Sequence, residues 1–358
     1  MDADYTAGEA LDPADEPFSE VDDEYHRQAD DPLNLETNWW SINIPERRIG
    51  IWLHSAYYPS DGKLRWRVFA WDERGADPAR LAYYKCVETR IEGSFPDMRD
   101  VAYPEGGYTL KMLKPLSDYR LTFADAAAGF SLECTFTASH PPFRFTPGEA
   151  PMVHNPHLDQ LGRYEGTLQL FGETIPIDCW SVRDRTWGPR EGVHEKSQKY
   201  SGRSPHVLHP GGPRWREVER ERGQGRVIYI FGHADDRCGF LSFARPQDGD
   251  VTGRSPLNSG WLLKDGRFAR LDKTRSWMRN WRDPLTGWTS HQEVQLVDAE
   301  GRRMEAEGMA VSRMCEFGRG ANSLMRWEFD GRIGWGEDQD DWRDNHFQRM
   351  VQALRGLR

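Results

Sequence analysis

The sequence has no run of about 18 apolar residues, so it offers no candidate membrane-spanning helix. No Walker loop and no Gly-x-Gly-x-x-Gly turn opens a helix after a strand, which argues against a nucleotide cofactor. There is no Gly-x-Ser-x-Gly nucleophile elbow. The N-terminus is acidic and lacks the basic, apolar pattern of a secretory signal. These absences favour a cytoplasmic protein that works without a bound cofactor.

Cysteine is scarce and widely spaced. The five cysteines form no Cys-x-x-Cys pair, which makes a zinc knuckle a poor interpretation and predicts no metal site. Their odd number favours the free thiols of a reducing compartment. They are Cys86, Cys134, Cys179, Cys238 and Cys315.

The net charge of −10 comes from one end of the chain. Residues 1–32 hold twelve acidic residues and one arginine, so the rest has 47 − 1 = 46 basic and 57 − 12 = 45 acidic residues. The body therefore has a net charge of +1 and gives no electrostatic footprint for nucleic acid. The acidic end is poor in apolar residues, which predicts disorder.

Fifteen tryptophans favour a β-rich fold with aromatic-lined surfaces or cavities. Apolar and polar residues mostly alternate from Trp39 onward, and turn signals recur about every ten residues, as in β-sandwiches and barrels. Strands are predicted over residues 49–58, 64–71, 80–90, 108–113, 119–124, 130–138, 162–170, 173–184, 226–234, 239–244, 260–264, 267–275, 290–297, 302–311 and 325–329.

Composition divides the chain into four parts. A proline-rich joint over residues 139–152 marks the expected boundary between two β domains. A polar insertion, either a lid or disordered, interrupts the second domain. The expected parts are an acidic disordered tail over 1–34, a β domain over 35–145, a β domain over 146–336 with the insertion at 194–225, and a C-terminal α-helix over 337–358.

The predicted helix rests on four apolar residues at helical spacing. Phe347, Met350, Val351 and Leu354 recur at i, i+3, i+4 and i+7, and Asp340 or Asp341 lies near the start as a candidate cap.

The stretch from Trp180 to Arg190 mixes three arginines, one carboxylate and two indoles. By the period of two, Asp184 shares a strand face with Val182 and Trp180, whereas Arg183 lies on the other face. A carboxyl beside such an apolar surface can stay protonated and act as a general acid.

Two other interpretations of Asp184 stay open. Arg185 or Arg190 would keep its carboxylate ionised, and the pair would then be a buried brace that locks the strand end. Simple anchoring of a ligand is the third interpretation.

A second cluster holds two histidines and an aspartate within six residues. His154, His157 and Asp159 could bind a metal, but no predicted helix holds both imidazoles on one face. One alternative is that His154 or His157 acts as an acid or base or makes a polar contact with substrate. The other is a structural histidine that only forms hydrogen bonds within a turn.

Four segments together resemble the hydroxyneurosporene synthase (carotenoid 1,2-hydratase)/AttH-like superfamily over roughly residues 35–335. The resemblance implies tandem lipocalin-like β-barrels and a cofactor-free site in a barrel cavity. The superfamily includes isoprenoid hydratases, kievitone hydratase-like enzymes and cyclisation catalysts resembling Diels–Alderases. The segments are Asn38-Trp39-Trp40, His154 to Arg163, Arg183 to Arg190 and Cys315 to Gly320.

The resemblance also implies a role for one residue. In the family's hydratases an aspartic acid of this motif protonates an alkene, and Asp184 matches it. Those hydratases carry a tyrosine two residues earlier, where this chain has Val182. That departure, with the insertion at 194–225, indicates a different substrate from a carotenoid.

These observations predict an all-β protein with two lipocalin-like domains that acts as a cofactor-independent lyase or isomerase on a hydrophobic isoprenoid, steroid-like or aromatic molecule. We expect Asp184 to be the general acid and His154 or His157 to move the second proton. The residues expected to contact substrate are Trp180, Trp187, Arg183, Arg185, Arg190 and Tyr164.

Two other function classes stay open. A lipocalin-like carrier would use the same cavity without chemistry, with Asp184 as a structural brace. A structural or partner-binding protein would use the C-terminal helix. The expected partner is a hydrophobic small molecule, with no nucleic acid, and a homodimer is an open alternative for the assembly.

Overall fold

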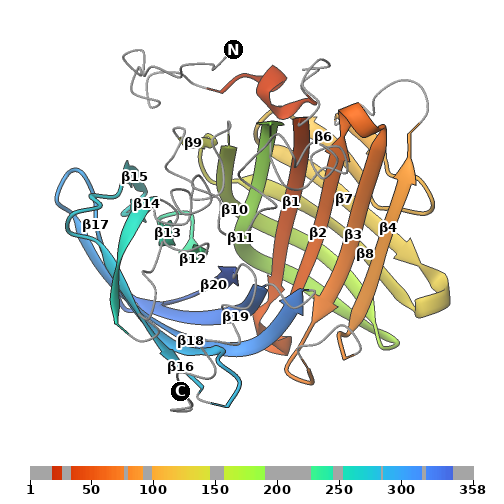
Figure 1. The fold of residues 1–358 in the computed structure, drawn as a ribbon. Helices are drawn as coiled ribbons and strands as arrows, with labels where there is room; N and C mark the ends of the chain where they lie inside the picture. The colour runs from red at the N-terminus through yellow and green to blue at the C-terminus, as the bar shows by residue number, and fades with distance from the viewer. Residues whose placement is uncertain are drawn as a thin grey trace, which may run out of the picture.

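The described residues fold almost entirely into strands, arranged as two antiparallel sheets (Figure 1). The predicted class, all-β with two lipocalin-like units in tandem, is confirmed. Within the part of the chain that the structure describes, no helix is long and apolar enough to span a membrane. The computed structural model describes residues 18–25, 34–75, 80–91, 99–145, 157–189, 227–244, 253–283, 285–316 and 320–341.

Sheet A, at the right of Figure 1, is a half-barrel of eleven described strands. Its strand order is β4-β3-β2-β1-β11-β10-β8-β7-β6-β5, and β9 pairs with β10. The strands are β1 (Asn34–Ile44), β2 (Ile49–Tyr58), β3 (Lys63–Trp71), β4 (Tyr83–Arg90), β5 (Asp100–Ala102), β6 (Thr109–Lys114), β7 (Asp118–Asp125), β8 (Phe130–Ala138), β9 (Phe143–Phe145), β10 (His157–Leu170) and β11 (Glu173–Pro189), with 3-10 turns η2 (Pro45–Arg47), η3 (Pro59–Asp61) and η4 (Ala126–Ala128).

Sheet B, at the lower left, closes into a barrel because β13 pairs with β14. The order around it is β13-β12-β20-β19-β18-β17-β16-β14, and β15 extends β14. The strands are β12 (Val227–Asp235), β13 (Cys238–Ala244), β14 (Arg254–Lys264), β15 (Arg267–Arg270), β16 (Trp277–Arg282), β17 (Thr289–Val297), β18 (Arg303–Glu316), β19 (Gly320–Phe329) and β20 (Arg332–Asp341).

Alternation of apolar and polar residues explains why these segments form strands. In β8, Phe130, Leu132, Cys134 and Phe136 are buried while the residues between them are partly or fully exposed. A period of two places every second side chain on one face, so only a strand buries all four. The predicted bounds of β2 and β8 are confirmed.

Three apolar clusters divide the interior into layers. One lines the inner face of sheet A and includes Trp40 and Trp66. A second fills the barrel of sheet B and includes Trp327. The third joins residues of both sheets, among them Trp39 and Phe231, and so forms the layer between them. Strand β11 borders this layer, since it contacts β12 and β20 of the barrel.

Side chains that reach across the barrel of sheet B fill its bore. Arg282 on β16 pairs with Asp340 on β20, with Nη2 and Oδ2 2.5 Å apart. Gln292 on β17 donates from Nε2 to Asp338 Oδ1 at 3.0 Å. Because β20 and β17 are separated by two strands, these contacts cross the bore. These polar pairs and the apolar cluster that includes Trp327 share the interior of the barrel.

The boundary between the sheets differs from the domain boundary expected near residue 145. β10 and β11, expected in the second domain, pair with β8 and β1 and belong to sheet A. β9 lies inside the proline-rich joint and pairs with β10. The joint is a connection within sheet A, because long-range pairing decides which sheet a strand joins.

The N-terminal segment also differs from the disorder expected over residues 1–34. Phe18–Tyr25 contains a 3-10 turn, η1 (Glu20–Asp23), and lies against the inner cluster of sheet A. The Asp23 carboxylate is buried and binds the Arg183 guanidinium at 2.9 and 3.2 Å. A buried ion pair therefore fixes a segment whose composition predicts disorder.

The start of the predicted C-terminal helix is a strand instead. β20 runs through Asp341, and Asp340 pairs with Arg282 inside the barrel rather than capping a helix. The acidic residues of β20 hide the alternation of apolar and polar residues that predicts a strand. They are buried because they pair with residues on distant strands, and the local sequence does not show those partners. The rest of the predicted helix, over residues 342–358, and the insertion at 194–225 lie outside the described residues.

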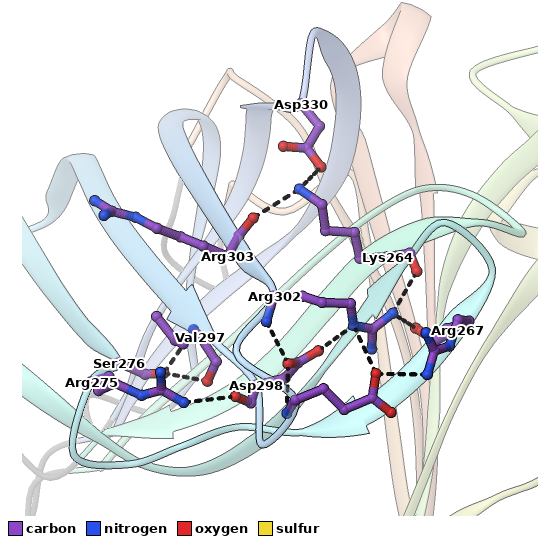
Figure 2. A network of polar contacts seen from close by, with 10 residues as sticks. Lys264, Arg267, Arg275, Ser276, Val297, Asp298, Arg302, Arg303 and Asp330 are labelled. Atoms are coloured by element: carbon purple, nitrogen blue, oxygen red, sulfur yellow. Dashed lines mark hydrogen bonds and ion pairs between the residues drawn. The ribbon is translucent and has the colours of Figure 1, made fainter.

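One buried carboxylate organises the rim of the barrel between β17 and β18. Asp298 Oδ1 accepts from the backbone N–H groups of Glu300 and Arg302, and its Oδ2 accepts from Arg302 Nε at 2.7 Å (Figure 2). Arg302 Nη1 also donates to the Lys264 carbonyl at 2.9 Å. The network ties this loop to the turn between β14 and β15.

Replacing Asp298 with alanine should lower the free energy of unfolding by about 2–4 kcal/mol, because it removes a buried carboxylate that accepts from Arg302 Nε and from two backbone N–H groups. Urea unfolding measures the loss. The matched control is Asp236→Ala, at an exposed turn position, which should change stability little. Equal effects of the two substitutions would show that the network contributes nothing.

Candidate active site

The register of β10 and β11 brings three ionisable side chains together. Asp159 lies directly opposite Asp184, and His157 lies opposite Thr186. Alternation places His157, Asp159 and Asp184 on one face of the pair. A nitrogen or oxygen of each lies within 4.8 Å of the others.

This face points into the layer between the sheets. Val182, on the same face of β11 as Asp184, belongs to the cluster shared by both sheets. Cys179 and Ile177 belong to the inner cluster of sheet A. The predicted division of β11 into two faces is therefore confirmed.

Hydrogen bonds link the imidazole to one carboxylate. His157 Nδ1 is 2.6 Å from Thr186 Oγ1, and its Nε2 is 3.1 Å from Asp159 Oδ2. The Tyr229 hydroxyl donates to Asp159 Oδ1 at 3.2 Å. Both imidazole contacts are satisfied when the proton of the ring is on Nε2. The Thr186 hydroxyl then donates to Nδ1, and the N–H at Nε2 donates to the Asp159 carboxylate.

Tyr229 acts in this network as a fixed donor. Burial raises its pKa well above the usual value, and the nearby charges of Asp159 and Asp184 raise it further. The phenol therefore keeps its proton over the physiological range and holds Asp159 from the barrel side.

Aromatic rings from both sheets surround the cluster. The His157 ring centroid lies 4.9 Å from Phe145 on β9 and 6.2 Å from Phe243 on β13. Trp39 is the β1 partner of Asp184, and its ring lies 6.0 Å from Tyr229. Rings exclude water and strengthen the electrostatic contacts inside them.

The three ionisable groups differ in access. His157 and Asp159 are 4% and 0% exposed, whereas Asp184 is only partly buried. Asp184 is therefore the most accessible of the three groups.

A further carboxyl lies in the same layer, on β20. Glu337 accepts hydrogen bonds from Trp52 Nε1 at 2.9 and 3.1 Å, from Gln339 Nε2 at 3.1 Å and from the Ser41 hydroxyl. Burial raises its pKa to about 7. Its backbone is close to β12, because a Cβ at Gly336 would lie 1.8 Å from the Phe231 carbonyl oxygen.

Two other histidines in the layer are neutral. Burial lowers the pKa of His140 to about 4, and its Nδ1 donates to the Pro141 carbonyl while its Nε2 accepts from the Leu161 N–H. Burial, with His140 nearby, lowers the pKa of His233 to about 3. Neither imidazole gains a proton near neutral pH, so neither histidine is suited to carry a proton during catalysis.

The same cluster contains the described residues that could hold a metal ion. His157, Asp159 and Asp184 could supply one nitrogen and two oxygens. Binding through Nε2 would require that atom to leave Asp159, to which it is now hydrogen-bonded.

The arginines expected to hold substrate lie on the opposite face of β11. Arg183 and Arg185 are both 0% exposed and face the inner side of sheet A. Arg183 binds Asp23, and Arg185 Nη2 donates to Glu36 Oε2 at 2.9 Å. The structure does not bring them to Asp184, because successive side chains of a strand point to opposite faces.

Two of the expected aromatic contacts also lie apart from Asp184. Trp187 packs beside Arg185 and Phe18 on the inner face. Tyr164 is buried there, and its hydroxyl donates to the Val182 carbonyl at 2.9 Å. Trp180 shares the face of Asp184, and its ring lies 5.0 Å from His233. His154 and Arg190 lie outside the described residues.

Four residues of the cluster were not among the predicted site residues. Asp159 follows His157 by two positions, so strand alternation could have placed both on one face. The others are Trp39, Tyr229 and Glu337. Tyr229 and Glu337 come from distant strands, and nothing in the local sequence marks them.

Glu337→Gln should change how stability depends on pH. The unfolded carboxyl has a pKa of 4.5 and the buried one a pKa of about 7. The parent should therefore lose stability as pH rises through this interval, by about 3 kcal/mol in all. The variant should lose this contribution, measured as the difference in unfolding free energy between the two proteins from pH 4 to pH 8.

The difference isolates Glu337, since the other buried groups titrate in both proteins. Glu328→Gln, at an exposed position on β19, should retain the parent's pH profile. A constant difference between parent and Glu337→Gln over the whole range would contradict the raised pKa.

A sequence model of one protein family, described as a domain of unknown function (DUF7064), matches residues 19–345. No curated protein matches the sequence. Among solved structures, CghA is similar, with a TM-score of 0.52 and 11% identity over 88% of this chain and 89% of CghA. CghA with Sch210972 gives 0.50 and 12% over the same shares.

Kievitone hydratase from Nectria haematococca has a TM-score of 0.47 and 9% identity over 89% of this chain and 93% of that chain. At such identities, the likeness to CghA shows the fold alone. The family model covers all but short ends of the chain, and the chain therefore belongs to the DUF7064 family.

Proposed function

We propose that this protein is an acid–base catalyst of the lyase or isomerase type that uses no bound cofactor and acts on a hydrophobic small molecule. The observation that carries the proposal is the cluster of His157, Asp159 and Asp184 within 4.8 Å, enclosed by aromatic rings between two sheets. Paired carboxyl groups in a water-poor site can hold a proton at one and a charge at the other.

Asp184 is the proposed proton donor. Asp159 has its two oxygens next to the Tyr229 hydroxyl and the His157 Nε2, contacts that suit a carboxylate. A second negative charge on Asp184 at this distance would be repelled, which favours a proton there. Its partial exposure lets that proton reach a bound substrate.

The other groups complete the transfer. Asp184 would give its proton to an alkene carbon or a carbonyl oxygen, and the positive charge that develops would lie near the ring of Trp39. The Asp184 carboxylate would then take a proton from the attacking water or from a neighbouring carbon, while Asp159, held by His157 and Tyr229, keeps its charge beside it. The proton that Asp184 gave is thereby replaced, and the site returns to its starting state without an oxidant or reductant.

The substrate class follows from the walls of the site. The rings of Phe145, Phe243, Trp39 and Tyr229 suit an isoprenoid, steroid-like or aromatic body. Arg183 and Arg185 pair with Asp23 and Glu36 on the other face of β11, so neither arginine binds a substrate carboxylate beside Asp184. The resemblance to the carotenoid hydratase superfamily gives Asp184 the same role.

Asp184→Asn should lower turnover by about 100-fold or more while the fold is retained, because an amide cannot supply the proton. The substrate for the measurement is the first compound converted from a panel of prenylated phenols and terpenoid alkenes. Turnover in deuterium oxide should place solvent deuterium in the product, as proton transfer from Asp184 requires.

The matched control is Asp178→Asn, at an exposed position on the same strand where the carboxylate pairs with Arg163 at 2.9 Å. It should leave turnover within a few-fold of the parent. Turnover of Asp184→Asn close to the parent's would refute the acid role. A lipocalin-like carrier would convert no member of the panel, and Asp184→Asn would then lose stability but keep its affinity for the ligand.

A further inference from the structure

The inner face of sheet A contains a built binding site for a carboxylate. Arg183 directs Nη1 and Nη2 at the two oxygens of Asp23, at 2.9 and 3.2 Å. The Tyr119 hydroxyl donates to the same carboxylate. A planar guanidinium that binds both oxygens is the arrangement with which arginine recognises carboxylates.

The arginine is held in place before any carboxylate binds. Its Nε donates to Gln160 Oε1 at 2.7 Å, and the Gln160 amide donates to the carbonyls of Leu116 and His140. The Tyr119 ring lies 4.4 Å from the guanidinium carbon. These contacts come from sheet A itself, so they do not depend on Asp23.

A second arginine faces the same carboxylate with an unused donor. Arg185 is 0% exposed, and its Nε has no hydrogen-bond partner among the described residues. This nitrogen is 3.9 Å from Asp23 Oδ1, beyond hydrogen-bond distance. Glu36 balances one of the two guanidinium charges and Asp23 balances the other. Without Asp23 the site would hold one uncompensated positive charge.

The segment that carries Asp23 also presents a phenol. The Tyr25 hydroxyl lies 3.1 Å from the Tyr103 hydroxyl, which lies 2.8 Å from Ser55 Oγ. The Tyr25 ring packs 5.9 Å from Tyr57 and lies over Arg185. Asp23 and Tyr25 thus fill the site as a carboxylate and a hydroxylated ring.

The segment is attached to sheet A through side chains. In the described residues its backbone hydrogen bonds run within the turn, from Asp22 to Ser19 and from Glu24 to Val21. The Glu24 carbonyl of the segment accepts from Arg185 on β11. A segment that joins no strand ladder can leave without breaking the sheet.

We propose that this site binds a hydroxylated aromatic carboxylate, and that Asp23 and Tyr25 occupy it in the absence of that ligand. The ligand carboxylate replaces that of Asp23 on Arg183 and Tyr119 and moves close enough to use Arg185 Nε. The ligand hydroxyl replaces that of Tyr25 beside Tyr103. The site lies on the opposite face of β11 from Asp184 and is independent of the proposed function.

The test uses the full chain and 4-hydroxyphenylacetate as the probe. Calorimetric titration should show that Asp23→Ala binds the probe at least about ten-fold more tightly than the parent, because the competing carboxylate is gone. Glu20→Ala, at an exposed position of the same turn, should bind like the parent. The neutral probe 4-hydroxyphenylacetamide should bind Asp23→Ala at least about ten-fold more weakly than the acid.

A second measurement uses the parent alone, in case Asp23→Ala does not fold. Saturating 4-hydroxyphenylacetate should speed hydrogen exchange of the amides over residues 18–25, and the amide probe should not. Asp184→Asn should behave like the parent, which separates this site from the candidate active site. Equal affinity of parent and Asp23→Ala, equal affinity for acid and amide, or unchanged exchange at saturation would each overturn the proposal.

Discussion

The alternation of side chains along β11 is the constraint on which both proposed sites depend. β11 lies between β1 and β10 in sheet A and contacts the barrel of sheet B on one side. One step along this strand therefore moves a side chain from the inner face of sheet A to the layer between the sheets. Arg183 and Asp184 are neighbours in sequence, yet they belong to different environments and cannot neutralise each other.

Burial then decides the chemistry of each face. On the inner face, Arg183 and Arg185 are removed from water and need buried anions, which Asp23 and Glu36 provide. In the layer between the sheets, the described residues include the carboxyl groups of Asp159, Asp184 and Glu337. There Asp159 relies on donors from His157 and Tyr229, and the Glu337 carboxyl has a raised pKa. If both proposals hold, β11 separates the binding of anions on one face from proton transfer on the other.

The sequence predicted the local features of this arrangement and not the long-range ones. Alternation predicted the strands, and it placed Asp184 on the face of Val182 and apart from Arg183, as the separate apolar clusters on the two faces of β11 confirm. It could not show that β10 and β11 join sheet A, because hydrogen-bond partners between strands leave no mark in composition. Asp23 and Glu337 were missed for the same reason. Each looks like a solvated acid in the sequence, and each is buried only because a partner arrives from more than a hundred residues away.

We propose ligand chemistry between the sheets, because an apolar cluster and cross-bore pairs occupy the interior of the barrel of sheet B. A crystal structure of the protein with a hydrophobic ligand retained from its host, or with the first converted compound of the panel, tests this most directly. We expect this structure to show a ligand in contact with the Asp184 carboxyl and with the rings of Trp39 and Tyr229. A ligand inside the barrel, among Met278 and Trp327 and away from Asp184, would contradict it.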